Sequence, residues 1–68
     1  MHRASSQERM QRLLEHVRKE EHLSEEDAIS FCDHALGVSQ QTCLRYLQWL
    51  ERAGLIRVSP DGIYPWSS

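Results

Sequence analysis

The sequence has no hydrophobic run near the ~20 residues that a membrane-spanning helix needs. It also lacks a basic surplus, because eight Lys and Arg stand against ten Asp and Glu and the formal net charge is -2. Nucleic-acid binders usually carry a basic surplus or stripe, so strong sequence-independent attraction to phosphate is not expected. The N-terminal residues lack the apolar core of a signal peptide, and cysteines are few. Both features favour a cytoplasmic chain with reduced thiols.

The 68 residues leave room for one domain with a small core, and 40% hydrophobic residues favour a globular chain over a disordered one. Charge is spread unevenly along the chain. Residues 24–36 contain four acidic side chains and no Lys or Arg, whereas residues 37–68 contain three Arg against two acids. The second half is therefore slightly basic, and the acidic cluster precedes it.

Two helices are predicted in the first half, over residues 6–21 and 24–36, after a disordered tail at residues 1–5. Ser5 and Glu8 have the spacing of a capping box, and Ser24 is a suitable N-cap followed by acidic residues that favour the positive helix end. The apolar side of the first helix comprises Met10, Leu13, Leu14 and Val17. The apolar side of the second comprises Ala28, Ile29, Cys32, Ala35 and Leu36, and Leu23 is a predicted core residue between them.

A tight turn and a third helix, over residues 39–53, are predicted next. Gly37 permits the turn, and Ser39 is a suitable N-cap. Cys43, Leu47 and Leu50 then recur at the spacing of one apolar helix face. We expect Tyr46 to pack against the first helix.

A β-hairpin is predicted over residues 55–66, with Leu55 to Val58 as its first strand. The stretch Ser59-Pro60-Asp61-Gly62 is a strong turn signal. Pro65 confines the returning strand to an edge or ends it, and we expect Trp66 to close the core beneath the hairpin.

The stretch GVSQQTCLRYLQWLERAGLI resembles the recognition-helix segment of winged helix-turn-helix domains, which run Val-Ser-x-x-Thr and end in Leu-Glu-x-x-Gly-Leu-Ile. The resemblance extends over nearly the whole chain, whose size and layout are similar to small regulators of bacterial fimbrial operons. It implies a mainly α fold of three helices with a small β-hairpin, in one domain over residues 1–68. It also implies sequence-specific binding of double-stranded DNA and regulation of transcription, with the third helix in the major groove.

Carried over position by position, the resemblance places the DNA-contacting residues on the third helix and at the base of the hairpin. Arg can bond a guanine edge, Gln can pair with adenine, and Leu can touch a thymine methyl group. Hydroxyl and first-turn N–H groups suit phosphate. Asp61 stands at the hairpin tip, where many of these domains carry Arg or Lys. The expected contacts are Ser39, Gln40, Gln41, Thr42, Leu44, Arg45, Gln48 and Arg57.

A second interpretation is a winged helix used for protein contact in a larger assembly. The excess of acidic over basic residues favours this interpretation. A homodimer on two half-sites is also expected, or a protein partner, bound through the first helix or Trp49. No enzyme, cofactor or metal site is predicted, because Cys32-x-His34 with Cys43 matches no zinc spacing. Cys32 and Cys43 are either buried free thiols or, if the two helices bring them close, a disulfide.

Overall fold

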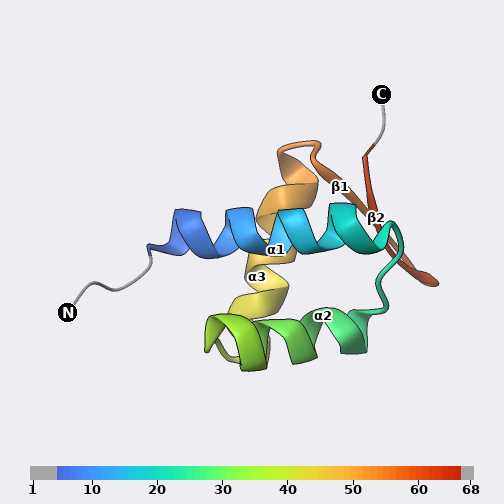
Figure 1. The fold of residues 1–68 in the computed structure, drawn as a ribbon. Coiled ribbons are helices and arrows are strands. Elements are labelled where there is room, and N and C mark those ends of the chain that lie inside the picture. Colours follow the sequence, from blue (N-terminus) through green and yellow to red (C-terminus); the bar gives the residue numbers. More distant parts are fainter. Residues whose placement is uncertain (1–4, 67–68) are drawn as a thin grey trace.

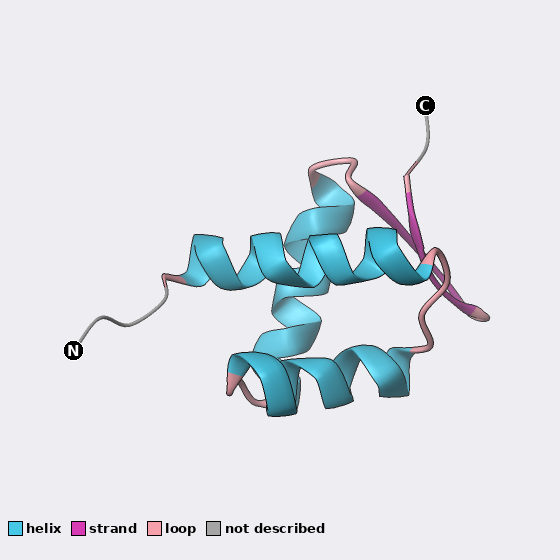
Figure 2. Ribbon diagram, viewed as in Figure 1, coloured by secondary structure: helices cyan, strands magenta, loops and turns pink. Residues whose placement is uncertain are grey.

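The computed structural model describes residues 5–66, so residues 1–4 of the expected tail lie outside the described residues. Three helical segments and a β-hairpin follow one another along the chain (Figure 1). The fold is therefore mainly helical with one small hairpin, as predicted (Figure 2). The elements are α1 (Ser6–Glu20), α2 (Glu25–Phe31) continued by the π-helical turn η1 (Cys32–Leu36), α3 (Gln40–Arg52), β1 (Ile56–Ser59) and β2 (Gly62–Pro65).

Serine caps fix where α1 and α2 begin. The Ser5 hydroxyl accepts a hydrogen bond from the Glu8 N–H at 3.1 Å, so Ser5 belongs to the helix cap rather than to the tail. The Ser24 hydroxyl accepts the Asp27 N–H at 3.1 Å in the same way. Each cap satisfies one N–H that has no partner within its helix.

The second helix does not stay α-helical to residue 36 as expected. From Cys32 it widens into η1, whose Cys32 carbonyl accepts the N–H of Gly37 and, at 3.1 Å, the N–H of Val38. A π turn holds more residues than an α turn, so the side chains after Cys32 leave the α-helical stripe. Ala35, predicted to be buried, is consequently exposed, and Val38 enters the core instead.

The third helix crosses behind α1 and α2 in Figure 1 and contacts both. Its buried side chains are Cys43, Tyr46, Leu47 and Leu50. Tyr46 is 2% exposed and lies against α1, where the Arg9 guanidinium donates to its hydroxyl at 3.4 Å. α3 ends where the Leu55 N–H bonds to the Leu50 carbonyl at 3.0 Å, after Gly54 in the left-handed region. Leu55 thus completes the helix end, and β1 begins one residue later than predicted.

The hairpin strands pair antiparallel, with Ile56 opposite Pro65 and Ser59 opposite Gly62. Leu23 adds a short third partner, because its N–H and carbonyl bond to the carbonyl and N–H of Ile63 at 2.9 and 2.7 Å. This bridge ties the segment between α1 and α2 to the hairpin, and it buries both side chains.

The prediction that Trp66 closes the core is wrong, since its side chain is 57% exposed. Side chains alternate along a strand, and Ile63, at 1% exposure, faces the core. Tyr64 and Trp66 share the parity that points the other way, so Trp66 lies on the outer face of the hairpin. Ile56, Ile63 and Leu23 close the core in its place.

One core joins all the elements. It contains only apolar and Cys or Tyr side chains, and no polar or charged residue is buried between residues 5 and 66. Burying a large apolar side chain stabilises the fold by about 1.5–3 kcal/mol. The core therefore fixes α3 against α1 and α2 and leaves the opposite side of α3 outside. No helix of the described residues is long and apolar enough to cross a membrane.

Candidate functional site

The side of α3 that faces away from the core carries a row of exposed side chains. Its members are Gln40, Gln41, Leu44, Arg45 and Gln48, which we call the α3 row. They recur at three- and four-residue spacing, as Cys43, Leu47 and Leu50 do on the buried side. Because Cys43, Leu47 and Leu50 pack into the core, the side chains of the α3 row on the other side take no part in that packing. The predicted contact residues of α3 are thus held together on a rigid, accessible surface.

The N-terminus of α3 has a hydrogen-bonded cap. The Thr42 N–H donates to the Ser39 hydroxyl at 3.3 Å, and that hydroxyl donates to the Thr42 hydroxyl at 3.1 Å. The Ser39 side chain is therefore engaged within the protein. The N–H groups of Gln40 and Gln41 precede the first α-helical bond, in which the Cys43 N–H reaches the Ser39 carbonyl at 2.9 Å. These two N–H groups and the Thr42 hydroxyl proton are donors that suit an anionic oxygen.

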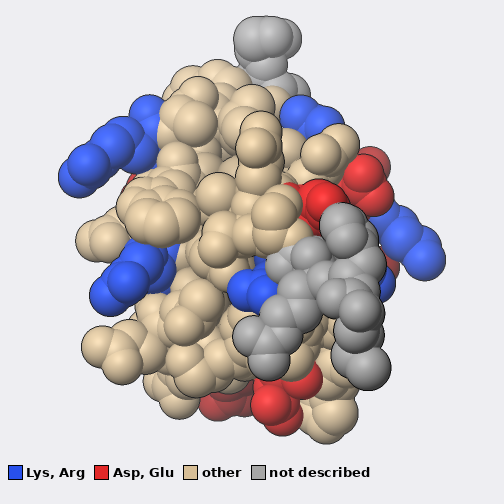
Figure 3. All heavy atoms as spheres, turned by 90° about the vertical axis from the view of Figure 1, so that its left-hand side faces the viewer, with Lys and Arg blue, Asp and Glu red and all other residues tan. Residues whose placement is uncertain are grey.

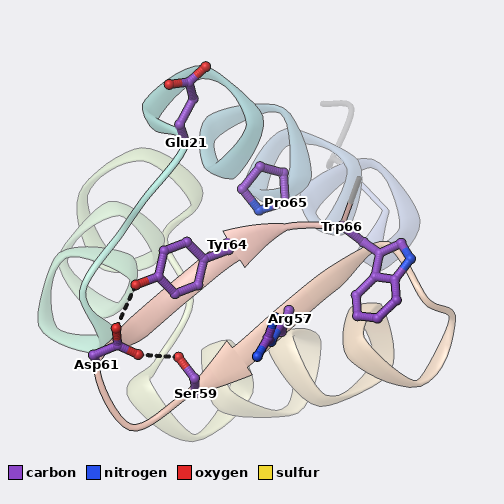
Figure 4. A pocket seen from close by; sticks show the side chains of 7 residues that line it. All are labelled: Glu21, Arg57, Ser59, Asp61, Tyr64, Pro65 and Trp66. Atoms are coloured by element: carbon purple, nitrogen blue, oxygen red, sulfur yellow. Dashed lines mark hydrogen bonds between the residues drawn. The ribbon is translucent and has the colours of Figure 1, made fainter. Parts of the chain in front are cut away.

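Arg57 is the predicted contact residue that does not belong to this surface. It is exposed on the outer face of the hairpin, where it pairs with Tyr64 in the strand register. The hollow there, of about 690 Å³, extends from the end of α1 to the tip of the hairpin (Figure 4). The residues that line it are Glu21, Arg57, Ser59, Asp61, Tyr64, Pro65 and Trp66.

Asp61 at the hairpin tip is held by a network that the sequence did not indicate. The Tyr64 hydroxyl donates to one carboxylate oxygen at 2.7 Å, and the Ser59 hydroxyl donates to the other (Figure 4). The hydrogen bonds from Ser59 and Tyr64 lower the pKa of Asp61, and donation to Asp61 raises the pKa of Tyr64. The tip therefore carries a fixed negative charge at neutral pH, which disfavours contact with phosphate.

The acidic start of α2 lies near this tip. Glu25 lines a hollow of about 160 Å³ together with Asp61 and other residues of the hairpin turn. α2 and η1 then lead away from the hairpin toward the turn before α3 (Figure 1). The acidic first turn of α2 therefore adds its charge to the side of the molecule that holds the hairpin tip.

An apolar groove separates α1 from the C-terminal half of α3. Its volume is about 380 Å³, and Trp49, 45% exposed, lies at its edge. The face of the molecule in Figure 3 shows Lys and Arg at the left, near the centre and at the right, Asp and Glu at the right and at the bottom, and residues of neither kind over the rest of the visible surface. The groove residues are Gln7, Met10, Gln11, Leu14, Glu15, Arg18, Trp49, Leu50, Ala53 and Leu55.

No group of three or more His, Cys, Asp or Glu side chains in residues 5–66 is arranged to hold a metal ion. His34 bonds back to its own helix, since its Nδ1 lies 2.9 Å from the Ser30 carbonyl. The His22 Nε2 lies 2.9 Å from the Asp61 carbonyl. Both imidazoles thus have hydrogen-bond partners within the protein.

Comparison with protein families identifies one segment of the chain. Residues 34–57 match the family described as winged helix-turn-helix DNA-binding. The match covers the turn, all of α3 and the start of β1, which is the segment on which the resemblance was based. No curated protein and no solved structure matches the chain significantly. Residues 34–57 are therefore similar to a winged helix-turn-helix DNA-binding segment, and they lie within a fold of three helical segments and a hairpin.

Proposed function

We propose that this protein binds double-stranded DNA sequence-specifically and regulates transcription, with α3 in the major groove. The main support for this proposal is the α3 row. Its Arg and Gln side chains are exposed on a rigid helix and take no part in packing the core. The family match supports DNA binding by the same segment. A major groove accepts one α-helix, and Arg and Gln are the side chains that pair with guanine and adenine edges.

The predicted contact residues divide into base contacts and backbone contacts. Arg45 and Gln41 read base edges, and Leu44, 38% exposed, contacts a thymine methyl group. The Thr42 hydroxyl and the first N–H groups of α3 hold a phosphate. Arg57 contacts the backbone from the hairpin, while the tip itself stays away from DNA because Asp61 is charged.

The net charge of -2 predicts weak binding by a single copy. We therefore propose that a second copy, or a protein partner, supplies further contacts through α1 or Trp49. Two copies related by a twofold axis would bind half-sites about one helical turn, 34–36 Å, apart. The cytoplasmic location expected from the sequence is part of this proposal.

Titration with mixed-sequence duplex DNA at low salt, followed by backbone amide NMR, tests the proposal directly. Shifts concentrated at Gln40, Gln41, Thr42 and Arg45, and weakening as salt rises, are the expected result. A selection from random duplexes then gives the preferred site. Shifts confined to the hairpin, or no shifts at high DNA concentration, would refute major-groove binding by α3.

Paired arginine variants separate base contact from general charge. Arg45 and Arg52 both lie exposed on α3, at its N-terminal and C-terminal halves. On the selected site we expect Arg45→Ala to raise Kd about 5- to 150-fold, the equivalent of roughly 1–3 kcal/mol, and to relax preference at one base pair. Arg52→Ala removes the same charge and is expected to change Kd less than about threefold. Equal increases in Kd in the two variants would show that positive charge, and not contact with a base, determines the affinity.

The second candidate is a protein-interaction module, favoured by Trp49 beside an open apolar groove and by the acidic hairpin tip. Exposed Trp residues are frequent among the side chains that dominate binding at interfaces. This function predicts no response to DNA, together with a partner whose binding is lost in Trp49→Ala. Binding to DNA through the α3 row, whether or not Trp49→Ala weakens it, supports the first candidate instead.

A further inference from the structure

Two cysteines meet in the core, one from each half of the helix-turn-helix. Cys32 is the first residue of η1 and Cys43 lies in α3, and both are 0% exposed. Their Sγ atoms are 2.7 Å apart, with the Cys32 thiol donating to Cys43. A disulfide bond measures about 2.05 Å. The two sulfurs are thus only slightly farther apart than the sulfurs of a disulfide bond.

The surroundings of the pair are also specific. The Cys43 thiol lies 3.5 Å from the carbonyl of Ala28, a fully buried residue one turn before Cys32. Cys43 is on the core side of α3, opposite the α3 row, so the proposed DNA contacts use neither sulfur. Both cysteines are free thiols in this structure.

We propose that Cys32 and Cys43 form a reversible intramolecular disulfide that joins η1 to α3. This modification site goes beyond the proposed DNA binding and does not depend on it. Disulfides of reducing compartments are mostly transient or redox-sensing, and an adjacent buried dithiol fits that behaviour. Formation and reduction of this bond make the domain respond to the ratio of disulfides to thiols in its surroundings.

The oxidant is a low-molecular-weight disulfide such as oxidised glutathione. The Cys43 thiolate attacks one of its sulfurs, forms a mixed disulfide and releases one glutathione thiolate. The Cys32 thiolate then attacks the Cys43 sulfur and displaces the second glutathione. Two protein thiols are oxidised, one disulfide is reduced to two glutathione thiols, and both protons pass to water or to the leaving thiolates.

Cys43 is the favoured attacking sulfur while the two cysteines stay in contact. The hydrogen bond donated by Cys32 lowers the pKa of Cys43, whereas donating that bond raises the pKa of Cys32. The thiolate is the nucleophile in exchange, and it forms more readily on the sulfur with the lower pKa. Since neither sulfur is exposed, exchange in the folded domain waits for local opening of η1. During refolding from urea the two sulfurs start apart, and either one can react first.

The bond closes a short loop that contains the whole turn before α3. Closing a loop of this size restricts the unfolded chain and raises Tm by about 10 °C or more in a domain this small. The sulfurs are already adjacent, so α3 keeps its position and the oxidised domain keeps the DNA affinity of the reduced one within about threefold.

The test refolds the full chain from urea in glutathione buffers that span reducing to oxidising ratios, so that access to the core is not limiting. Alkylation followed by intact mass measurement counts the remaining thiols. The expected product is a monomer that has lost two hydrogen atoms, has no alkylatable thiol, melts at the higher Tm and is restored by dithiothreitol.

Cys32→Ala and Cys43→Ala are matched controls, because each keeps one thiol. They are expected to form no intramolecular bond and to show no redox-dependent Tm. The proposal is overturned if the wild-type chain stays fully reduced in excess oxidised glutathione, gives only disulfide-linked dimers or mixed disulfides, or forms the bond with a fall in Tm. None of these results bears on DNA binding, which the NMR titration tests separately.

Discussion

Gly62 is the position where we predict the largest effect from the smallest substitution. It begins β2 with φ at +145°, a region that side chains with a Cβ rarely adopt. A Cβ at this position would collide with the His22 ring and stand 3.1 Å from the Leu23 carbonyl oxygen. That carbonyl accepts the Ile63 N–H at 2.7 Å, so it has little freedom to move. Gly62→Ala therefore strains the bridge between the hairpin and the segment after α1.

The magnitude follows from two separate losses. Backbone strain in a sparsely populated region costs about 1–3 kcal/mol. The His22 ring must also swing away and give up its 2.9 Å contact with the Asp61 carbonyl, a loss of about 0.5–1.5 kcal/mol. Together these reach about 1.5–4.5 kcal/mol. A domain of 68 residues has roughly 3–10 kcal/mol of stability in total.

Thermal and urea unfolding by circular dichroism measure the effect. We expect Gly62→Ala to lower Tm by about 10–20 °C. Gly54→Ala is the matched control, because Gly54 has φ +76° but nothing within 4 Å of the added Cβ; it should cost only about 1–2 kcal/mol. The reasoning is refuted if Gly62→Ala is no more destabilising than Gly54→Ala, or if adding His22→Ala fully restores the stability of Gly62→Ala.

Two further predictions concern the hairpin tip and the start of α3. The folded pKa of Asp61 lies below its ordinary value of 3.8, so its hydrogen bonds stabilise the fold above about pH 4 and this contribution is lost as pH falls through the folded pKa. Asp61→Asn should flatten the fall in stability below pH 4 in urea unfolding, and an unchanged slope would argue against the network. Ser39→Ala removes the cap that holds the Thr42 N–H at 3.3 Å and should cost about 1 kcal/mol, whereas Ser6→Ala, on the exposed first turn of α1, should leave Tm nearly unchanged.

The acidic hairpin tip also bears on which part of the protein would contact DNA. Its carboxylate is held by two hydroxyl groups, and the acidic start of α2 lies beside it. A positive tip would add phosphate contacts and sequence-independent affinity. Here Arg45 and Arg52 are exposed on α3 itself, so specificity is expected to depend on that helix more than on the hairpin.

The sequence alone determined the features that depend on neighbours along the chain. Ser5, Ser24 and Ser39 each bond an N–H three residues later, as their capping positions predicted. Apolar spacing predicted the buried stripe of α3, and Gly54 marked its end. These features have a local physical cause, since caps, periodicity and left-handed turns involve residues within about one helical turn. The family match, over residues 34–57, covers those of these features that belong to α3.

Only the tertiary structure decided the features that depend on contacts across the chain. The widening of the second helix at Cys32 and the bridge between Leu23 and Ile63 have no signal in local spacing. The adjacency of Cys32 and Cys43, which the sequence left open, likewise results from packing α3 against α2. Burial is shared among elements far apart in the chain, so the fold selects which side chains fill the core. The side chains of the α3 row point outward for the same reason, because the other side of α3 packs into the core.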